Sequence, residues 1–291
     1  MRNFVLALFV AYLATGVATA AQKQDSLAVM FWNVENFFEP GDSSASVYWT
    51  KSRFYRKCDG IAKTVLEVTE RLGKLPDAIG FAEIGNRNVL QKLISNTILR
   101  KLDYGIIHYD SPDKRGIDCA LLYRKTILEP EKIQVRQLLD VNGNIIPTRD
   151  ILVCEFDRIC ILVNHHPSKL GDGAAERRKQ AMELMRHLGD SLSARAQGRP
   201  TIAIGDFNDT LWGTSATGTI KYDGKWEKID GGFGFGGTIF KEEVFSSESL
   251  VEHDKTHGGI KPRRTFNGPR YSGGISDHFP VIFTIFTKSD N

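Results

Sequence analysis

Cysteine is scarce in this sequence, and the scarcity excludes a fold held by disulfides. The chain has 291 residues and only four cysteines, too few for a disulfide framework at this length. Their spacing matches no structural zinc motif. Cys119, Cys154 and Cys160 lie in apolar runs and are interpreted as buried thiols. A bridge between Cys154 and Cys160, across a predicted turn at Asp157-Arg158, stays open as an alternative.

A strong excess of one charge is also missing. The formal net charge is +3, from 38 Lys and Arg against 35 Asp and Glu. Such a mildly basic balance permits a polyanionic partner without requiring one. Internal repeats, low-complexity tracts and an interdomain linker are absent as well. We therefore expect a single domain over residues 21–291.

Apolar runs long enough to span a membrane are missing as well, and the most marked apolar stretch stands at the N-terminus. Arg2 precedes an apolar stretch over 4–12, and Ala18-Thr19-Ala20 forms a small-residue cleavage site. This pattern predicts a signal peptide over residues 1–20, which is too short to span a membrane. No cysteine follows the predicted site, which disfavours a lipid anchor. We expect an exported protein, periplasmic or extracellular.

Hydrophobic periodicity separates predicted strands from predicted helices. Helical spacing covers 58–72, 88–102 and 174–193. Strands are predicted at 27–33, 78–82, 104–109, 117–123, 127–139, 151–155, 159–164, 201–204 and 279–286. An aromatic and basic loop is expected at 48–57 and a glycine loop at 231–237. Because strands occur both in hairpin succession and with helices between them, the pattern indicates mixed sheets covered by helices.

The segment after the strand predicted at 201–204 carries the most distinctive polar residues. It reads Gly205-Asp206-Phe207-Asn208. Alternation along an extended chain places Asp206 and Asn208 on the same side. A carboxylate and a carboxamide placed together can hold a water or a metal-bound phosphate, but glycine, aspartate and asparagine also form ordinary turns. The motif alone leaves both interpretations open.

Other strands end in polar residues in the same way. Each of these residues has a structural alternative as a cap or turn former, but catalytic side chains gather at strand ends on a rigid scaffold. The residues that follow or adjoin an apolar run are Asn33, Glu83, His165, Asp206, Asn208, Asp277 and His278. Their equivalent positions favour one shared site over independent accidents.

Five segments, taken in order, resemble the endonuclease/exonuclease/phosphatase superfamily with its DNase I-like fold. They lie at 32–36, 82–84, 163–168, 205–208 and 276–281, so the resemblance spans nearly the whole chain after residue 32. It implies a secreted bacterial member with an α+β fold, a four-layer α/β/β/α sandwich of two mixed sheets packed face to face with outer helices. It also implies hydrolysis of phosphodiesters with Mg²⁺ or Mn²⁺ as cofactor.

The resemblance assigns metal binding to Asn33, Glu83 and Asp277. It assigns catalytic roles to the remaining motif residues. His165 would donate to the phosphate, Asp206 would act on water or the leaving group, and Asn208 would steady the phosphate. His278 would be the base or electrostatic partner of the attacking water, oriented by an acid. Asp230 matches that acid best, and Asp254 is the fallback.

Basic residues near the expected active face are candidate phosphate ligands. Lys114 is interpreted as a solvated charge. For Arg115 and Arg177, phosphate binding and a solvated charge remain open alternatives.

The motifs leave three functions to be compared: two enzymes with different substrates and a protein without activity. The inositol phosphatase motifs of the superfamily are missing, and an exported phosphodiesterase suits extracellular DNA or RNA, so a secreted endonuclease is the first hypothesis. A sphingomyelinase-like phospholipid phosphodiesterase is the alternative, with Gly231–Phe240 as its membrane hairpin. A catalytically silent binding module is disfavoured because every motif position is filled.

Overall fold

The computed structural model describes residues 26–210 and 218–287. The predicted signal peptide over 1–20 lies outside the described residues. Within these two ranges, no helix has the length and apolar character needed to cross a membrane.

One mixed sheet of six strands has the order β12-β17-β1-β2-β4-β3. Strands β1 and β2 are parallel, and all other neighbours are antiparallel. The bounds are β1 Ser26–Phe37, β2 Ala78–Ile84, β3 Tyr104–His108, β4 Asp118–Arg124, β12 Ile239–Val244 and β17 Val281–Phe286.

A second mixed sheet of five strands has the order β11-β8-β7-β6-β5. Only β7 and β8 run parallel in it. The bounds are β5 Pro130–Arg136, β6 Ile151–Phe156, β7 Cys160–His165, β8 Thr201–Asp206 and β11 Asp230–Phe235. Three short hairpins complete the strands: β9 Ile220–Tyr222 with β10 Lys225–Glu227, β13 Val251–His253 with β14 Ile260–Pro262, and β15 Phe266–Asn267 with β16 Arg270–Tyr271.

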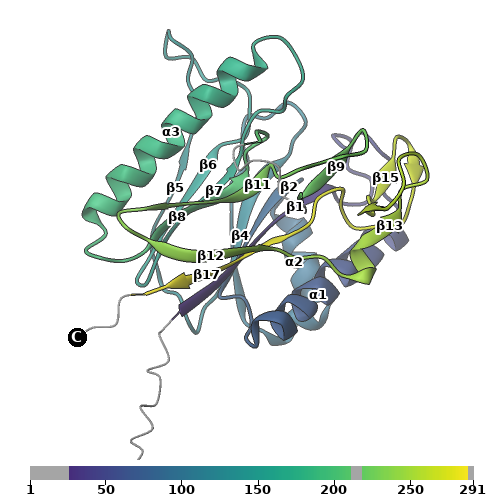
Figure 1. The fold of residues 1–291 in the computed structure, drawn as a ribbon, viewed down its shortest axis with the longest axis horizontal. Helices are drawn as coiled ribbons and strands as arrows, with labels where there is room; N and C mark the ends of the chain where they lie inside the picture. Colours follow the sequence, from purple (N-terminus) through teal and green to yellow (C-terminus); the bar gives the residue numbers. More distant parts are fainter. Residues whose placement is uncertain (1–25, 211–217, 288–291) are drawn as a thin grey trace, which may run out of the picture.

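The helices lie on the outer faces of the two sheets. Helix α3 (Ala174–Arg195) covers the five-stranded sheet, while α1 (Lys51–Leu72) and α2 (Arg87–Ser95) cover the six-stranded one (Figure 1). Short 3₁₀ turns, η1 (Ile98–Lys101) and η2 (Glu248–Leu250), account for the remaining helical residues in the two described ranges. The predicted four-layer sandwich is confirmed.

Strands buried on both faces explain the continuous apolar runs in the sequence. In β1, Val29 and Phe31 pack between the sheets, whereas Met30 and Trp32 pack under α1 and α2. The two sheets approach closely at Gly80 of β2. A Cβ placed there would lie 2.9 Å from Ile204 of the opposite sheet, so only glycine fits without a shift.

The predicted aromatic loop at 48–57 is wrong in its second half, because α1 begins at Lys51. The side chain of Thr50 caps this helix by accepting the Arg53 N–H, the usual device that satisfies a first-turn donor. Trp49 and Phe54 are buried in the core, while Tyr48 and Tyr55 are exposed. Sequence periodicity missed the first turn because its apolar residue, Phe54, stands among charged ones.

The glycine loop predicted over 231–237 is also wrong, since residues 230–235 form strand β11. Glycine is accepted here because neighbours crowd the strand: a Cβ on Gly232 would lie 2.7 Å from the Phe283 ring. The turn that follows uses Gly236 and Gly237, both at positive φ. Phe235 is buried and Phe233 packs against the core beneath α3, so neither offers the exposed apolar tip required of a membrane hairpin.

The three cysteines predicted as buried thiols are buried and free. Cys154 pairs in register with Ile161, and Cys160 with Glu155. The alternative of a Cys154–Cys160 bridge is therefore wrong for this structure. Burial raises the pKa of both thiols, so neither suits a nucleophile.

Candidate active site

The polar residues at the strand ends lie on the face of each sheet that points toward the other sheet. Ile202 and Ile204 of β8 pack in the inter-sheet core, and two residues further on Asp206 ends the strand on the same face. The same alternation brings His165 to the end of β7. Since β7 and β8 are parallel, with His165 in register with Asp206, both side chains meet at one edge of the sandwich.

Asp206 is the centre of the group. The side-chain amide of Asn33, from β1 of the other sheet, donates to Asp206 Oδ2 over 3.0 Å. His165 Nε2 lies 3.7 Å and His278 Nε2 3.9 Å from the same oxygen. Burial, and next the neighbouring carboxylate of Asp230, raise the pKa of Asp206 to about 7. A carboxyl with such a pKa exchanges its proton near neutrality.

His278 is oriented by Asp230, as the sequence predicts. Its Nδ1 lies 2.9 Å from Asp230 Oδ2 and 3.1 Å from Oδ1. The pKa of His278 is raised well above its usual value: burial opposes the charged ring, but the charge and hydrogen bond of Asp230, followed by the charges of Asp206 and Asp277, outweigh burial. The geometry therefore favours an imidazolium paired with a carboxylate.

The position of Asp230 depends on Thr219, a buried residue that sequence reasoning missed. The Thr219 hydroxyl accepts the backbone N–H groups of Ile229 and Asp230, and its carbonyl accepts that of Phe279, next to His278. One side chain and its backbone thus hold both halves of the pair. No sequence motif marks this threonine.

Asp254, the fallback partner of His278, is engaged elsewhere. Its Oδ2 lies 2.9 Å from the Lys221 ammonium, and that hydrogen bond lowers its pKa. Its Oδ1 accepts the backbone N–H groups of Thr256 and His257. The structure thus brings Asp230, and not Asp254, to His278.

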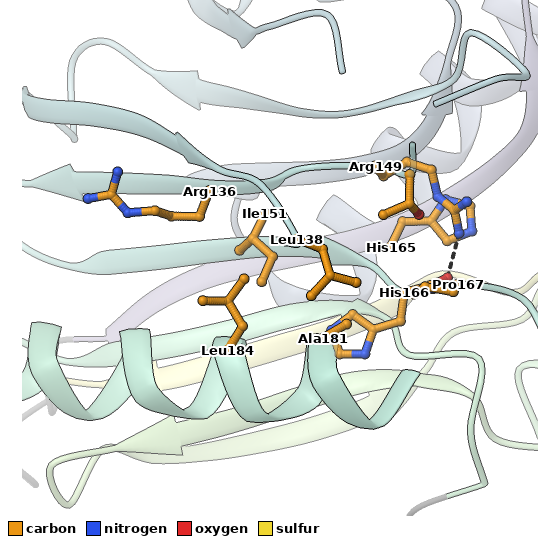
Figure 2. Close-up of a pocket in the computed structure, with 10 residues that line it drawn as sticks. Arg136, Leu138, Arg149, Ile151, His165, His166, Pro167, Ala181 and Leu184 are labelled. Carbon is orange, nitrogen blue, oxygen red and sulfur yellow. Dashed lines mark hydrogen bonds between the residues drawn. The ribbon is translucent and has the colours of Figure 1, made fainter. Parts of the chain in front are cut away.

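The adjacent residues His165 and His166 have different surroundings. Burial first, and the charge of Arg149 second, lower the pKa of His165 well below its usual value and that of His166 to about 3. Both rings are therefore neutral at physiological pH. Arg149 donates to the His166 carbonyl oxygen, and the His166 ring projects toward α3 (Figure 2). His165, on the inter-sheet side, is the one that reaches Asp206.

A second group of acids lies beside the first. Glu83 lies within a register shift of β2, between Phe81 and Ile84, and has a positive φ of 65°. Irregularities of this kind re-aim side chains near functional sites. One Glu83 oxygen accepts the Asn36 N–H over 2.7 Å, and the other lies 3.2 Å from Arg115. Arg115, a candidate phosphate ligand, is therefore at the site but bound to a carboxylate.

Glu35 belongs to this second group and was missed. Glu35 stands two residues after Asn33 in the same motif. Side chains two residues apart on a strand point to the same side, and this spacing is the signal that would have identified Glu35. Arg264 bridges Glu35 and Asp277 over 3.1 and 2.8 Å. Burial, and next the charge of Asp277, raise the pKa of Glu35 to about 7.

Lys57 lies beneath Glu35 and was missed too. Its ammonium donates to the Glu35 carbonyl over 2.6 Å and to the Thr265 hydroxyl over 2.8 Å. Burial lowers its pKa to about 8. Lys57 stands three residues after Phe54 and four before Ile61, on the apolar face of α1. A lysine at such a position signals a buried partner.

Two groups of side chains at the site offer ligand atoms for a divalent cation. Glu35, Glu83 and Asp277 offer carboxylate oxygens, the ligands that Mg²⁺ and Mn²⁺ prefer, and their contacts with Arg115 and Arg264 show a place where positive charge is already favoured. Asp206, Asp230 and His278 form another set, whose ligand atoms lie within 4.8 Å of one another. The first set includes two of the three predicted metal ligands.

In the part of the chain that the structure describes, the side chains of Asn208 and Arg177, two of the predicted site residues, form no hydrogen bond or ion pair with these metal-binding candidates. The side-chain amide of Asn208 donates to the His166 carbonyl over 3.0 Å, and its backbone N–H to Asp206 Oδ1 over 2.9 Å. It therefore ties the ends of β7 and β8 together, and its phosphate role stays a prediction. Arg177 lines a separate cavity with Lys114 and Arg149.

A sequence model described as "Endonuclease/Exonuclease/phosphatase family" matches residues 28–235 and 218–287. The chain belongs to the endonuclease/exonuclease/phosphatase family. Phosphoester hydrolysis is the activity of this family. The resemblance to the family found in the sequence is confirmed, whereas secretion and a bacterial origin stay predictions. No curated protein matches the chain.

Solved structures share the fold of this family member at low sequence identity. TDP2 from Caenorhabditis elegans is 17% identical, with a TM-score of 0.59 over 92% of this chain and 78% of its own. A Bacteroides thetaiotaomicron family protein is 16% identical, with 0.57 over 92% and 100%. The mannosyl-6-phosphatase Bt3783 of the same bacterium is 18% identical, with 0.55 over 89% and 99%.

Proposed function

We propose that this protein is a divalent-metal-dependent phosphodiester hydrolase that acts as a secreted endonuclease on DNA or RNA. The observation that carries the proposal is the pair of His278 and Asp230, set beside Asp206 and within reach of His165. Family membership supports phosphoester hydrolysis, and the choice of a nucleic acid is ours. Export rests on the predicted signal peptide.

The residues divide the chemistry by charge and proton state. His278, held as an imidazolium by Asp230, stabilises negative charge on the phosphate. Asp206, with a pKa of about 7, accepts a proton from water or returns one to the leaving group. Neutral His165 donates a hydrogen bond to a phosphate oxygen. A Mg²⁺ or Mn²⁺ ion held by Glu35, Glu83 and Asp277, with the Asn33 amide beside it, would supply Lewis-acid stabilisation of the same charge.

Two features of the chain support a nucleic acid over a lipid as the substrate. Phe233 and Phe235 pack into the core beneath α3, so Ile239 is the one large apolar residue that the candidate hairpin over 231–240 exposes. Exposed Tyr48, Tyr55 and Tyr222 stand among lysines and arginines. Aromatic faces among basic residues suit stacked bases and phosphates.

Plasmid degradation tests the proposal directly. Wild-type protein with Mg²⁺ should nick or degrade a plasmid, and a chelator should stop it. The His278→Ala variant should lose about 10²-fold or more in rate, because the charge near the phosphate is lost. Choline phosphate release from sphingomyelin without plasmid nicking would replace the nuclease with the lipid enzyme. Binding of either substrate without turnover would favour the silent binding module.

A further inference from the structure

A basic cavity of about 330 Å³ opens beside the end of β7. Its wall includes the side chains of Lys114, Arg149 and Arg177 together with Thr148 and Ser168. None of the described residues that line it is acidic. A cavity of this size with three cations and two hydroxyls has the donor set of an anion site.

Arg149 joins this cavity to the proposed active site. It also lines a small hollow of about 10 Å³ together with His165 and His166, and Figure 2 shows its hydrogen bond to the His166 carbonyl oxygen. Its Nη1 lies 2.9 Å from Asp113 Oδ2. Asp113 in turn accepts the backbone N–H of Arg115, which contacts Glu83. The side chain of Arg149 therefore separates the cavity from the acids and histidines of the site.

The guanidinium of Arg149 is held in place before any ligand arrives. Its side chain is only 7% exposed and is fixed by Asp113 and the His166 carbonyl. Arg149 Nε and the hydroxyl of its neighbour Thr148 are buried and have no partner among the described residues. Buried donors without partners are rare in folded proteins, and here they sit in the wall of the cavity and the hollow.

Lys114 and Arg177 supply the other two positive charges of the cavity wall. Within the described residues, neither side chain forms an ion pair, so two positive charges face the cavity with no carboxylate to offset them. Lys114 comes from the loop before β4, and Arg177 from the first turn of α3. Lys114 is exposed, in keeping with the interpretation of a solvated charge, and it also lines the cavity.

We propose that this basic cavity binds a second phosphate of the nucleic-acid strand, next to the phosphate that is cleaved. The proposal rests on the proposed nuclease function and deepens it. One phosphate lies at His165, Asp206 and His278, and its neighbour along the strand lies against Lys114, Arg149 and Arg177. A substrate with two phosphates then binds better than a substrate with one.

Two oligonucleotides of matched sequence separate the two phosphate sites. A dinucleoside monophosphate has the scissile phosphate only, and a trinucleoside diphosphate adds the neighbour. Wild-type enzyme with Mg²⁺ should prefer the longer substrate by about tenfold in kcat/KM. Arg177→Ala, and Lys114→Ala to a smaller extent, should raise KM for the longer substrate, leave its kcat within about twofold, and leave the shorter substrate unchanged.

Lys101→Ala is the matched control, because Lys101 is an exposed lysine on η1 next to α2, on the other side of the molecule. It should change neither KM nor the preference. The slope of log Kd against log salt for a single-stranded oligonucleotide should fall by about 0.7 in Arg177→Ala and stay constant in Lys101→Ala. Thermal unfolding of each variant shows whether it is folded.

The outcomes distinguish failure of this proposal from failure of the proposed function. Cleavage of both substrates with no preference, or a preference that survives in Arg177→Ala, would overturn the second phosphate site and leave the nuclease intact. Absence of both cleavage and salt-dependent binding would overturn the nuclease and this site with it.

Discussion

At the scale of single residues, the site consists of charged side chains that lie in specific pairs, because a buried charge is costly without a partner of opposite charge. His278 with Asp230 and Glu35 with Arg264 each place opposite charges in contact at the edge between the sheets. Removing Asp230 leaves the His278 ring buried without its carboxylate, whereas Arg264 without Glu35 keeps its contact with Asp277. Substitutions that keep the shape and remove the charge therefore report on each pair separately.

Asp230→Asn should lower turnover by about 10²-fold or more, because the His278 imidazolium loses the carboxylate that raises its pKa. Asp254→Asn is the comparison, since Asp254 pairs with Lys221. It should leave kcat within about threefold of wild type. Steady-state kinetics at fixed Mg²⁺ check both variants. A larger loss in Asp254→Asn would show that the wrong acid is paired with His278.

His166 should make the protein less stable in acid. The pKa of His166 is about 3 in the folded protein, against an ordinary value of 6.5. Between pH 3 and pH 6.5 the imidazole is therefore protonated in the unfolded chain and neutral in the folded protein. Stability contributed by the neutral ring is complete above pH 6.5 and falls as pH drops through this window, by about 1.4 kcal/mol per unit.

The variant that isolates this effect is His166→Phe, which keeps a ring against Phe207, 5.0 Å away between centroids. Urea unfolding at pH 7 and pH 4.5 should show a smaller loss for the variant than for wild type. Equal losses in the two proteins would mean that other groups carry the acid sensitivity.

At the scale of elements, α3 and β11 show how packing sets backbone requirements. Strand β11 pairs with β8 so that Asp230 stands opposite Asp206, and the far end of β11 carries Phe235 against α3. The ring lies where a side chain on Gly189 would be: a Cβ there would come within 2.3 Å of it. The glycine inside α3 is therefore a packing requirement of the strand that carries Asp230.

Gly189→Ala should lower the free energy of unfolding by about 1–3 kcal/mol, since overpacking outweighs the better helix propensity of alanine. Adding Phe235→Leu should restore part of the loss, because the smaller side chain makes room. Ser191→Ala, on the exposed face of the same helix, is the control and should stay within about 0.5 kcal/mol of wild type. Urea unfolding of the four proteins gives the coupling energy. Independent, additive effects would contradict the contact.

At the scale of the whole molecule, the two sheets meet in an apolar core and hold the acids at one edge. Asn33 from the six-stranded sheet reaches Asp206 of the five-stranded sheet, and the Trp32 indole donates to the His278 carbonyl. The site thus exists only when the layers are packed. A cation bound there should stabilise the assembled sandwich as a unit.

Mg²⁺ or Mn²⁺ should therefore raise the melting temperature. At about ten times Kd, binding adds about 1.4 kcal/mol, or about 3 °C in Tm. Glu83→Gln should abolish the shift, and a chelator should reverse it in wild type. Asp110→Asn is the control, because Asp110 belongs to a separate acidic group with His108 and Asp118. A shift lost in Asp110→Asn and kept in Glu83→Gln would move the metal to that group.

Much of the fold and several of the site residues could be predicted from the local sequence pattern. Helix α3, the strands with uninterrupted apolar runs, and the polar ends at Asn33, His165 and Asp206 follow from periodicity, since alternation carries a face along a strand. The start of α1 and the whole of β11 could not be predicted. In both, the deciding factor is what packs against the segment: the core around Phe54, and the Phe235 and Phe283 rings around the glycines.

The ordered motifs by themselves determined that this chain is a member of the endonuclease/exonuclease/phosphatase family, because each motif places a fixed side chain at a strand end. Only the tertiary structure decided which acid orients His278, that Glu35 and Lys57 belong beside the site, and that Lys114, Arg149 and Arg177 share one cavity. Those relations join residues far apart in the chain, and they arise from the packing of two sheets against each other, which local pattern does not encode.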